Sequence, residues 1–189
     1  MNQSELWDDF YRSNPRPWRG NNKVPCPTPG KALDIGCGNG KTTSTLIDLG
    51  CDVTGIDFSH LAIESCKSRF PGSNFLVADA TELPFDDSSF DFVAAVHVVE
   101  NLDDGRLAHM ASEVRRVLRS GGHVFVRTFT ASDMRSEKRS TGDIVYRYRE
   151  PEDVVSFFDE FEVITAERID EQTKFGTTRS RTECLFMKI

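Results

Sequence analysis

The feature that most constrains the fold of this chain is a short apolar stretch that leads directly into three closely spaced glycines. Residues 31–35 read Lys-Ala-Leu-Asp-Ile, which is typical of a buried strand, and the glycines follow at positions 36, 38 and 40. Glycine tolerates positive φ angles and has no Cβ, so a ligand can come close to such a turn. Residues 41–49 then read as a helix whose first N–H groups point toward that ligand. The stretch therefore predicts a strand–turn–helix unit that binds a nucleotide.

Three kinds of glycine-rich loop compete for this turn. The dinucleotide pattern G-x-G-x-x-G fails at its third glycine, where Lys41 stands. The phosphate-binding pattern G-x-x-x-x-G-K-[ST] fits Gly40-Lys41-Thr42, but its opening glycine would fall on Ile35. An acid followed by G-x-G-x-G fits without a defect, with Asp34 as the acid. This third pattern resembles the first motif of the Rossmann-like methyltransferases that use S-adenosylmethionine.

A second acid follows at the spacing at which nucleotide-binding units hold a ribose. Residues 51–57 form an apolar stretch that ends in Asp57, about 20 residues beyond the glycines. A carboxylate suits a ribose because its two oxygens can accept from both hydroxyls. The alternative is that Asp57 only caps the next helix, but Ser59 can do that equally well. Spacing and residue type together favour the ribose contact.

The chain after the third expected strand, residues 74–79, resembles the same methyltransferase family from Thr81 to Val93. In that family the acid after this strand contacts the adenine amino group, and the next backbone N–H contacts a ring nitrogen. The resemblance implies these roles for Asp79 and Ala80. Residues 106–119 read as a long amphipathic helix that ends at Gly121-Gly122, and residues 123–129 read as the next strand. Residues 115–122 also resemble the late motif of the family. The competing interpretation is the metal-associated aspartate of a P-loop enzyme, which needs a proper phosphate-binding loop upstream.

His97 follows the fourth expected strand, at the edge where open α/β sheets bind ligands. The family often has a second histidine nearby, whereas this chain has Glu100-Asn101. His97 is therefore either a cofactor wall or proton acceptor, or a histidine that only starts a helix. The eight acids between 79 and 104, with no Lys or Arg, favour a cationic sulfonium over a polyphosphate. The cofactor contacts implied by the resemblance are Asp34, Gly36, Cys37, Gly38, Gly40, Asp57, Phe58, Asp79, Ala80, Val96 and His97.

Two further segments are candidates for closing over a ligand. Residues 1–28 hold an aromatic helix and a proline-rich stretch, so they form either a docked helix with a linker or a lid that excludes water. Residues 130–149 carry five Lys or Arg against three acids, so they form either a solvated loop or a loop for an anionic or aromatic acceptor. The expected lid and substrate contacts are Tyr11, Trp18, Arg19, Arg147 and Tyr148.

Composition narrows the function classes. A net charge of -7 over 189 residues argues against a general nucleic-acid surface. No apolar run reaches the roughly 20 residues that a membrane span needs. The five cysteines include no C-x-x-C pair, which favours reduced thiols over disulfides or a zinc site. We therefore expect a cytoplasmic chain with no metal site and no membrane partner.

Strands and helices alternate along the chain, which predicts a doubly wound, mostly parallel α/β sheet with helices on both faces. The resemblance implies seven strands with the last one antiparallel, in a single domain at 29–189 preceded by the lid segment 1–28. It also implies methyl transfer from S-adenosyl-L-methionine, in which the sulfonium is already a good leaving group and positioning carries most of the catalysis. The alternatives are a P-loop nucleotide hydrolase and an inactive methyltransferase fold that only binds.

The methyl acceptor is the least constrained part of the prediction. A small molecule is favoured because the chain lacks an appended recognition domain, and a tRNA or a protein remains an alternative. The tetrapeptide Arg179-Ser180-Arg181-Thr182 resembles the tails of tRNA wobble-uridine methyltransferases. Some of these need a small zinc-binding activator subunit, so the resemblance also implies that partner.

Overall fold

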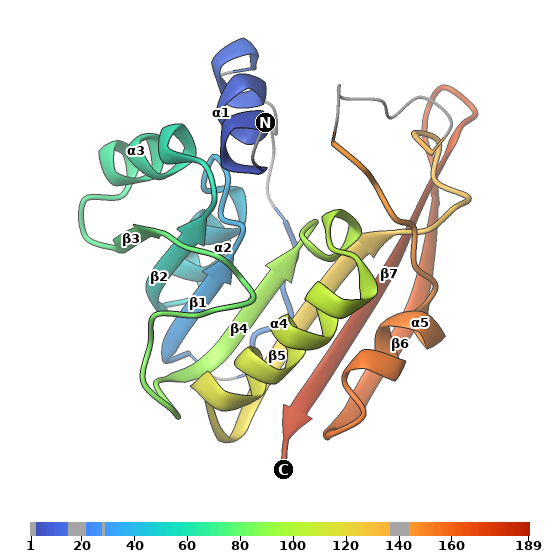
Figure 1. Cartoon of the computed structure of the whole chain (residues 1–189). Helices are drawn as coiled ribbons and strands as arrows, with labels where there is room; N and C mark the ends of the chain where they lie inside the picture. Colours follow the sequence, from blue (N-terminus) through green and yellow to red (C-terminus); the bar gives the residue numbers. More distant parts are fainter. Residues whose placement is uncertain (1–2, 15–21, 28, 137–143) are drawn as a thin grey trace.

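The computed structural model describes residues 3–14, 22–27, 29–136 and 144–189, and these form a seven-stranded sheet. The strand order is β3-β2-β1-β4-β5-β7-β6 (Figure 1). Strand β7 runs antiparallel to both of its neighbours, and the other strands run parallel to one another. The predicted sheet is therefore confirmed. Its strands are β1 (Lys31–Ile35), β2 (Asp52–Asp57), β3 (Asn74–Val77), β4 (Phe90–Val96), β5 (Leu118–Phe129), β6 (Phe161–Gln172) and β7 (Thr178–Lys188).

Helices cover both faces of this sheet, as the alternation of strands and helices predicts. In β4, Ala94 packs in a cluster with Leu46 of α2, while Ala95 packs on the other face in a cluster with Met110 of α4 and Val154 of α5. Successive side chains of a strand point to opposite faces, so one buried strand contributes side chains to the hydrophobic core on each face of the sheet. Figure 1 shows α4 and α5 together on one face. The helices are α1 (Gln3–Ser13), α2 (Lys41–Asp48), α3 (His60–Arg69), α4 (Asp104–Val117) and α5 (Pro151–Phe157), with a 3-10 turn η1 (Val99–Asn101).

The long helix α4 and the strand that follows it begin earlier than the sequence indicates. Asp103 caps α4, because its side chain accepts a hydrogen bond from the backbone N–H of Arg106. The helix ends at Val117, and Leu118 is already extended. The Gly121-Gly122 pair, which the sequence places at the helix end, lies inside β5 instead.

Helix α1 docks on the N-terminal end of α3. Asp8 accepts hydrogen bonds from the hydroxyl of Ser59 at 2.5 Å and from the backbone N–H of Leu61 at 3.3 Å. The hydroxyl of Ser4 donates to the carbonyl of Phe58 at 2.9 Å. The aromatic side of α1 is thereby fixed over the end of β2, close to the glycine turn. Across the described ranges, we find no helix with the length and apolarity required to cross a membrane.

Candidate functional site

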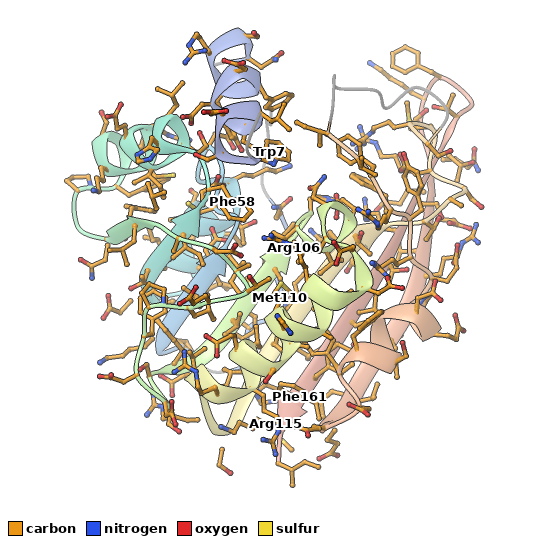
Figure 2. All side chains as sticks on the ribbon, in the orientation of Figure 1. Trp7, Phe58, Arg106, Met110, Arg115 and Phe161 are labelled. Carbon is orange, nitrogen blue, oxygen red and sulfur yellow. The ribbon has the colours of Figure 1, made fainter. Side chains whose placement is uncertain are left out.

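A cavity of about 280 Å³ lies at the edge of the sheet where β1, β2, β4 and β5 end. Its walls come from the glycine turn, from the ends of these strands, from α1, and from the β5–β7 side of the sheet. Figure 2 shows Trp7, Phe58 and Arg106 at this edge, each from a different element. This is the edge at which open α/β sheets bind ligands. The cavity therefore lies where the sequence predicts the site.

The three glycines of the turn adopt the conformation for which glycine is required. Their φ angles are 66° at Gly36, 52° at Gly38 and 78° at Gly40, all in the left-handed region. A Cβ at Gly36 would lie 2.5 Å from a methyl carbon of Val98, and one at Gly38 would lie 2.6 Å from the hydroxyl of Tyr11. The turn therefore packs closely against helix α1 and against the segment after β4.

Three backbone donors of the turn, at Cys37, Gly38 and Gly40, are used within the protein. The N–H of Cys37 donates to the carbonyl of Ile56 at 2.9 Å, and the N–H of Gly40 donates to the carbonyl of Cys37 at 2.8 Å. The N–H of Gly38 donates to Oδ2 of Asp57 at 2.9 Å. A phosphate-binding loop needs such N–H groups to be available to the phosphate, and a carboxylate beside them would repel it. The geometry thus argues against the P-loop alternative.

Asp57 lies at the end of β2 and lines the cavity. In addition to the bond from Gly38, its Oδ1 accepts from the backbone N–H of Ser59 at 2.9 Å. These two bonds fix both oxygens and leave further lone pairs to accept from a ligand. Burial is the main cause that raises the pKa of Asp57, to about 6. The carboxylate is therefore held rigidly, at the position from which a diol could be bound.

Two of the expected cofactor contacts, Asp34 and Gly40, do not line the cavity. Asp34 is 1% exposed and accepts from the hydroxyl of Thr43 at 2.6 Å, so it ties β1 to the start of α2. Burial raises the pKa of Asp34 to about 7. Gly40 is the N-cap of α2 and packs against Phe70 and Cys66. Asp34 and Gly40 therefore stabilise the turn on the side away from the cavity.

Asp79 is also absent from the cavity wall, because Arg106 binds it. The Nη2 atom of Arg106 lies 3.0 Å from both oxygens of Asp79, and Thr81 donates twice to Oδ1 at 2.8 Å. The Arg106 guanidinium also lies 5.6 Å from the ring of Phe58. The neighbouring Ala80 lines the cavity, as do Phe58 and Arg106 themselves. A flat aromatic ligand could therefore lie against Phe58, at the rim next to the Asp79–Arg106 pair.

His97 is held in a strained conformation beside the cavity. It is not glycine, but its φ is 62°. Its ring stacks on Phe129 with the centroids 4.0 Å apart, and its Nδ1 lies 3.1 Å from Oε1 of Glu100. Glu100 is 1% exposed and also accepts from the hydroxyl of Thr128 at 2.9 Å. A carboxylate on Nδ1 favours the tautomer whose Nε2 lone pair is available. Sequence reasoning treated Glu100 only as a departure from the family pattern, and its pairing with His97 went unforeseen.

The lid and substrate contacts are found only in part. Tyr11 lines the cavity, together with Trp7 from the same helix. Tyr148 does not line the cavity, because its hydroxyl donates to the carbonyl of Ser136 at 3.2 Å. Tyr146 lines it instead. Arg147 does not line the cavity either, although its backbone N–H donates to the carbonyl of Glu100. Trp18 and Arg19 lie outside the described residues.

The remaining expected contacts do lie together. The cavity wall includes Gly36, Cys37, Gly38, Asp57, Phe58, Ala80, Val96 and His97. Five arginines that are not among the contacts named from the sequence also line it: Arg106, Arg127, Arg135, Arg179 and Arg181.

Comparisons with known proteins agree with this geometry. Residues 33–126 match the profile of a family described as a methyltransferase domain. The demethylmenaquinone methyltransferase of Renibacterium salmoninarum is 36% identical over 100 residues, which cover 53% of this chain and 41% of that protein. The chain thus spans about two fifths of the length of this curated relative.

Two solved structures share the fold. A SAM-dependent methyltransferase from Methanosarcina mazei has a TM-score of 0.73 at 22% identity, and the match covers 84% of this chain and 92% of that one. A methyltransferase in complex with the Haloferax volcanii Trm112 methyltransferase activator has a TM-score of 0.74 at 21% identity, covering 86% of this chain and 84% of that one. At these identities the likeness concerns the fold.

Proposed function

Since the chain belongs, through residues 33–126, to the class I Rossmann-like methyltransferase family, we propose that it transfers a methyl group from S-adenosylmethionine to an acceptor bound in the cavity. The observation that carries this proposal is the position of Asp57. Its carboxylate is fixed by two backbone N–H groups at the cavity wall, next to a turn whose N–H groups at Cys37, Gly38 and Gly40 already have acceptors. Such a site fits a ribose diol, and the three occupied N–H groups disfavour a triphosphate.

The residues of the cavity fit the cofactor in three parts. Asp57 would accept hydrogen bonds from the ribose hydroxyls, and Phe58 and Ala80 would contact the adenine, with Asp79 next to its amino group. Asp79 keeps a role at this position because Oδ2 accepts only from Arg106, which leaves it a lone pair. The turn at Gly36 and Gly38 would pass beneath the methionyl part. When bound, the cofactor supplies the electrophilic methyl group.

We propose that His97 accepts the proton that the acceptor loses. Its ring lines the cavity, and Glu100 holds it through Nδ1, so that Nε2 can receive a proton from an acceptor hydroxyl, thiol or amine. The buried Glu100 would stabilise the imidazolium that forms. Helix α1 would cover the site through Trp7 and Tyr11 and exclude water from it.

The affinity for the cofactor product S-adenosylhomocysteine should depend on pH. In the unliganded protein Asp57 has a pKa of about 6, so it is protonated below that pH. Binding a diol requires the carboxylate, so binding at lower pH must release a proton. We expect the dissociation constant to rise about tenfold per pH unit below about pH 6 and to be flat above it. Calorimetry across this range measures it. The variant Asp57→Asn cannot titrate, so a similar slope in that variant would contradict the assignment.

The class of the methyl acceptor and the need for an activator subunit are two separate proposals. A small-molecule acceptor is supported by the cavity, which joins the cofactor residues to the β5–β7 side of the sheet. An activator subunit is supported only by the fold similarity to a methyltransferase bound to one. If the purified chain binds S-adenosylhomocysteine but transfers no methyl group, we expect activity to appear when such an activator is added.

The proposed function is tested with S-adenosylmethionine labelled in its methyl group. The purified chain is incubated with a cell extract that has been separated into small-molecule, RNA and protein fractions. We expect label to be transferred to the small-molecule fraction. Transfer to no fraction, with or without the activator, would contradict the proposed enzyme and favour a fold that only binds.

A further inference from the structure

One side of the cavity carries an unusual concentration of positive charge. It is formed by the ends of β5 and β7, by the start of α2 and by the segment after β5. We call these side chains the basic wall, and they are Lys41, Arg127, Arg135, Arg179 and Arg181. The whole chain has a net charge of -7, so this clustering is local.

Strand register brings these side chains together. Arg181 on β7 lies opposite Phe129 on β5, and Arg127 lies opposite Glu183. Residues two apart on a strand point to the same face, so Arg179 and Arg181 project side by side with Arg127. All of them face the side of the sheet on which α2 begins. The arrangement therefore depends on pairing between segments that are more than 50 residues apart.

Part of the charge is compensated by neighbouring carboxylates. Nε of Arg127 donates to Glu183 at 2.8 Å, and its Nη2 donates to the carbonyl of Lys23. Arg181 contacts both oxygens of Glu171, at 3.0 and 3.1 Å. These pairs position the two guanidinium groups. Nε of Arg181 also lies 3.3 Å from Oε1 of Glu183, so Arg127 and Arg181 share that carboxylate.

The charge of two of the five cations is not compensated by any described carboxylate. Arg135 has the buried Asp133 at 3.7 Å, whereas Lys41 and Arg179 have no carboxylate within ion-pair distance among the described residues. Among the described residues, three carboxylates lie within ion-pair distance of the five cations of the basic wall, which leaves an excess of two positive charges. The excess positive charge acts on Lys41: burial is the main cause that lowers the pKa of its ammonium group, and the arginines of the basic wall lower it further. Uncompensated, partly buried charges of one sign form a binding site for the opposite sign.

The basic wall adjoins the proposed proton acceptor. Phe129 stacks on His97 at 4.0 Å, and the Arg135 guanidinium lies 4.8 Å from the same ring. A molecule held by the wall therefore lies next to the imidazole. The cofactor does not cancel the excess charge, because its sulfonium and ammonium outweigh its single carboxylate.

We propose that the methyl acceptor carries a carboxylate or phosphate group that the basic wall binds, with its nucleophilic atom toward His97. This inference rests on the proposed function, and it names the chemical class of the substrate. Arginine provides paired N–H donors that match a carboxylate or phosphate, so Arg179 and Arg181 are the main contacts. Lys41 contributes as a point charge.

The test uses calorimetry with simple anions on the full chain. Inorganic phosphate and benzoate are the probes, and benzamide is the neutral analogue of benzoate. Each probe is titrated at constant ionic strength, both without and with saturating S-adenosylhomocysteine. The variants are Arg179→Gln, the double variant Arg179→Gln/Arg181→Gln and the control Arg168→Gln. Arg168 is an ion-paired arginine on β6 whose partners are Asp170 and Glu150, so it controls for loss of a surface charge.

We expect at least one anion to bind the wild type in the millimolar range in the presence of S-adenosylhomocysteine, and benzamide not to bind. The double variant should lose at least tenfold in anion affinity, while its affinity for S-adenosylhomocysteine and that of the control stay within threefold. The preferred probe distinguishes a carboxylate acceptor from a phosphorylated one. No anion binding, equal binding by the double variant, or anions that compete with S-adenosylhomocysteine would each overturn the proposal. The titration without S-adenosylhomocysteine shows whether the basic wall binds anions, even if the chain does not bind the cofactor.

Discussion

The variant Asp57→Ala is expected to bind S-adenosylhomocysteine at least about 100-fold more weakly than the wild type. The carboxylate is fixed at the cavity wall by the N–H groups of Gly38 and Ser59, and each hydrogen bond to a charged group contributes about 1.5–3 kcal/mol. A ribose would make two such bonds. Alanine removes both, and it also leaves the N–H of Gly38 without its acceptor. Calorimetry at about pH 7.5, above the pKa of Asp57, measures the difference.

Loss of folding must be separated from loss of the ligand contact. Asp91 is the matched control, because it also accepts from a backbone N–H, that of Lys31 at 2.8 Å, yet it does not line the cavity. Asp91→Ala should bind S-adenosylhomocysteine within threefold of the wild type. Thermal unfolding of both variants shows whether the fold is retained. If Asp57→Ala also bound within threefold, the ribose assignment would be wrong.

His97→Ala should lower kcat by about 10²- to 10⁴-fold, the usual contribution of a positioned general base. The expected effect lies in kcat, because His97 is proposed to act on the proton rather than to bind the cofactor. KM and the affinity for S-adenosylhomocysteine should therefore change by less than about threefold. Glu100→Gln removes the charge that holds the imidazole, and we expect a smaller loss of kcat. The assay follows labelled methyl transfer to the acceptor fraction identified above.

A positional role for His97 can be distinguished from a catalytic one by adding imidazole. Free imidazole should restore part of the activity of His97→Ala, because the side chain leaves a space of that shape next to Phe129. His109→Ala, at an exposed position on α4, is the control and should have wild-type activity. Full activity of His97→Ala would show that the acceptor needs no base from the protein.

The arrangement of the glycine turn and Asp57 could be predicted from the sequence because it is local. The turn and Asp57 belong to one strand–helix–strand unit, so spacing alone brings them together. The glycines adopt positive φ angles, and Asp57 bonds to Gly38, as a ligand-binding turn of this kind requires. Asp34, expected as a cofactor contact, does not line the cavity. Side chains along a buried strand alternate between the two faces of the sheet, and the side chain of Asp34 points toward Thr43.

The acceptor side could not be predicted because it depends on contacts between distant segments. The guanidinium of Arg127 meets Glu183, and the carboxylate of Asp79 meets Arg106, only after the sheet has formed. Periodicity shows that Arg179 and Arg181 share a face of a strand, but not which face is toward the cavity. Polar composition left residues 130–149 as either a solvated loop or an acceptor loop, whereas much of the positive charge at the cavity comes from β5 and β7.

The measurement that tests this account most directly is calorimetry of the wild type with S-adenosylhomocysteine and, separately, with ATP and magnesium. The account predicts binding of S-adenosylhomocysteine with one molecule per chain, and no heat from ATP, because the turn offers no free N–H groups at Cys37, Gly38 and Gly40. Tight binding of ATP without binding of S-adenosylhomocysteine would contradict it.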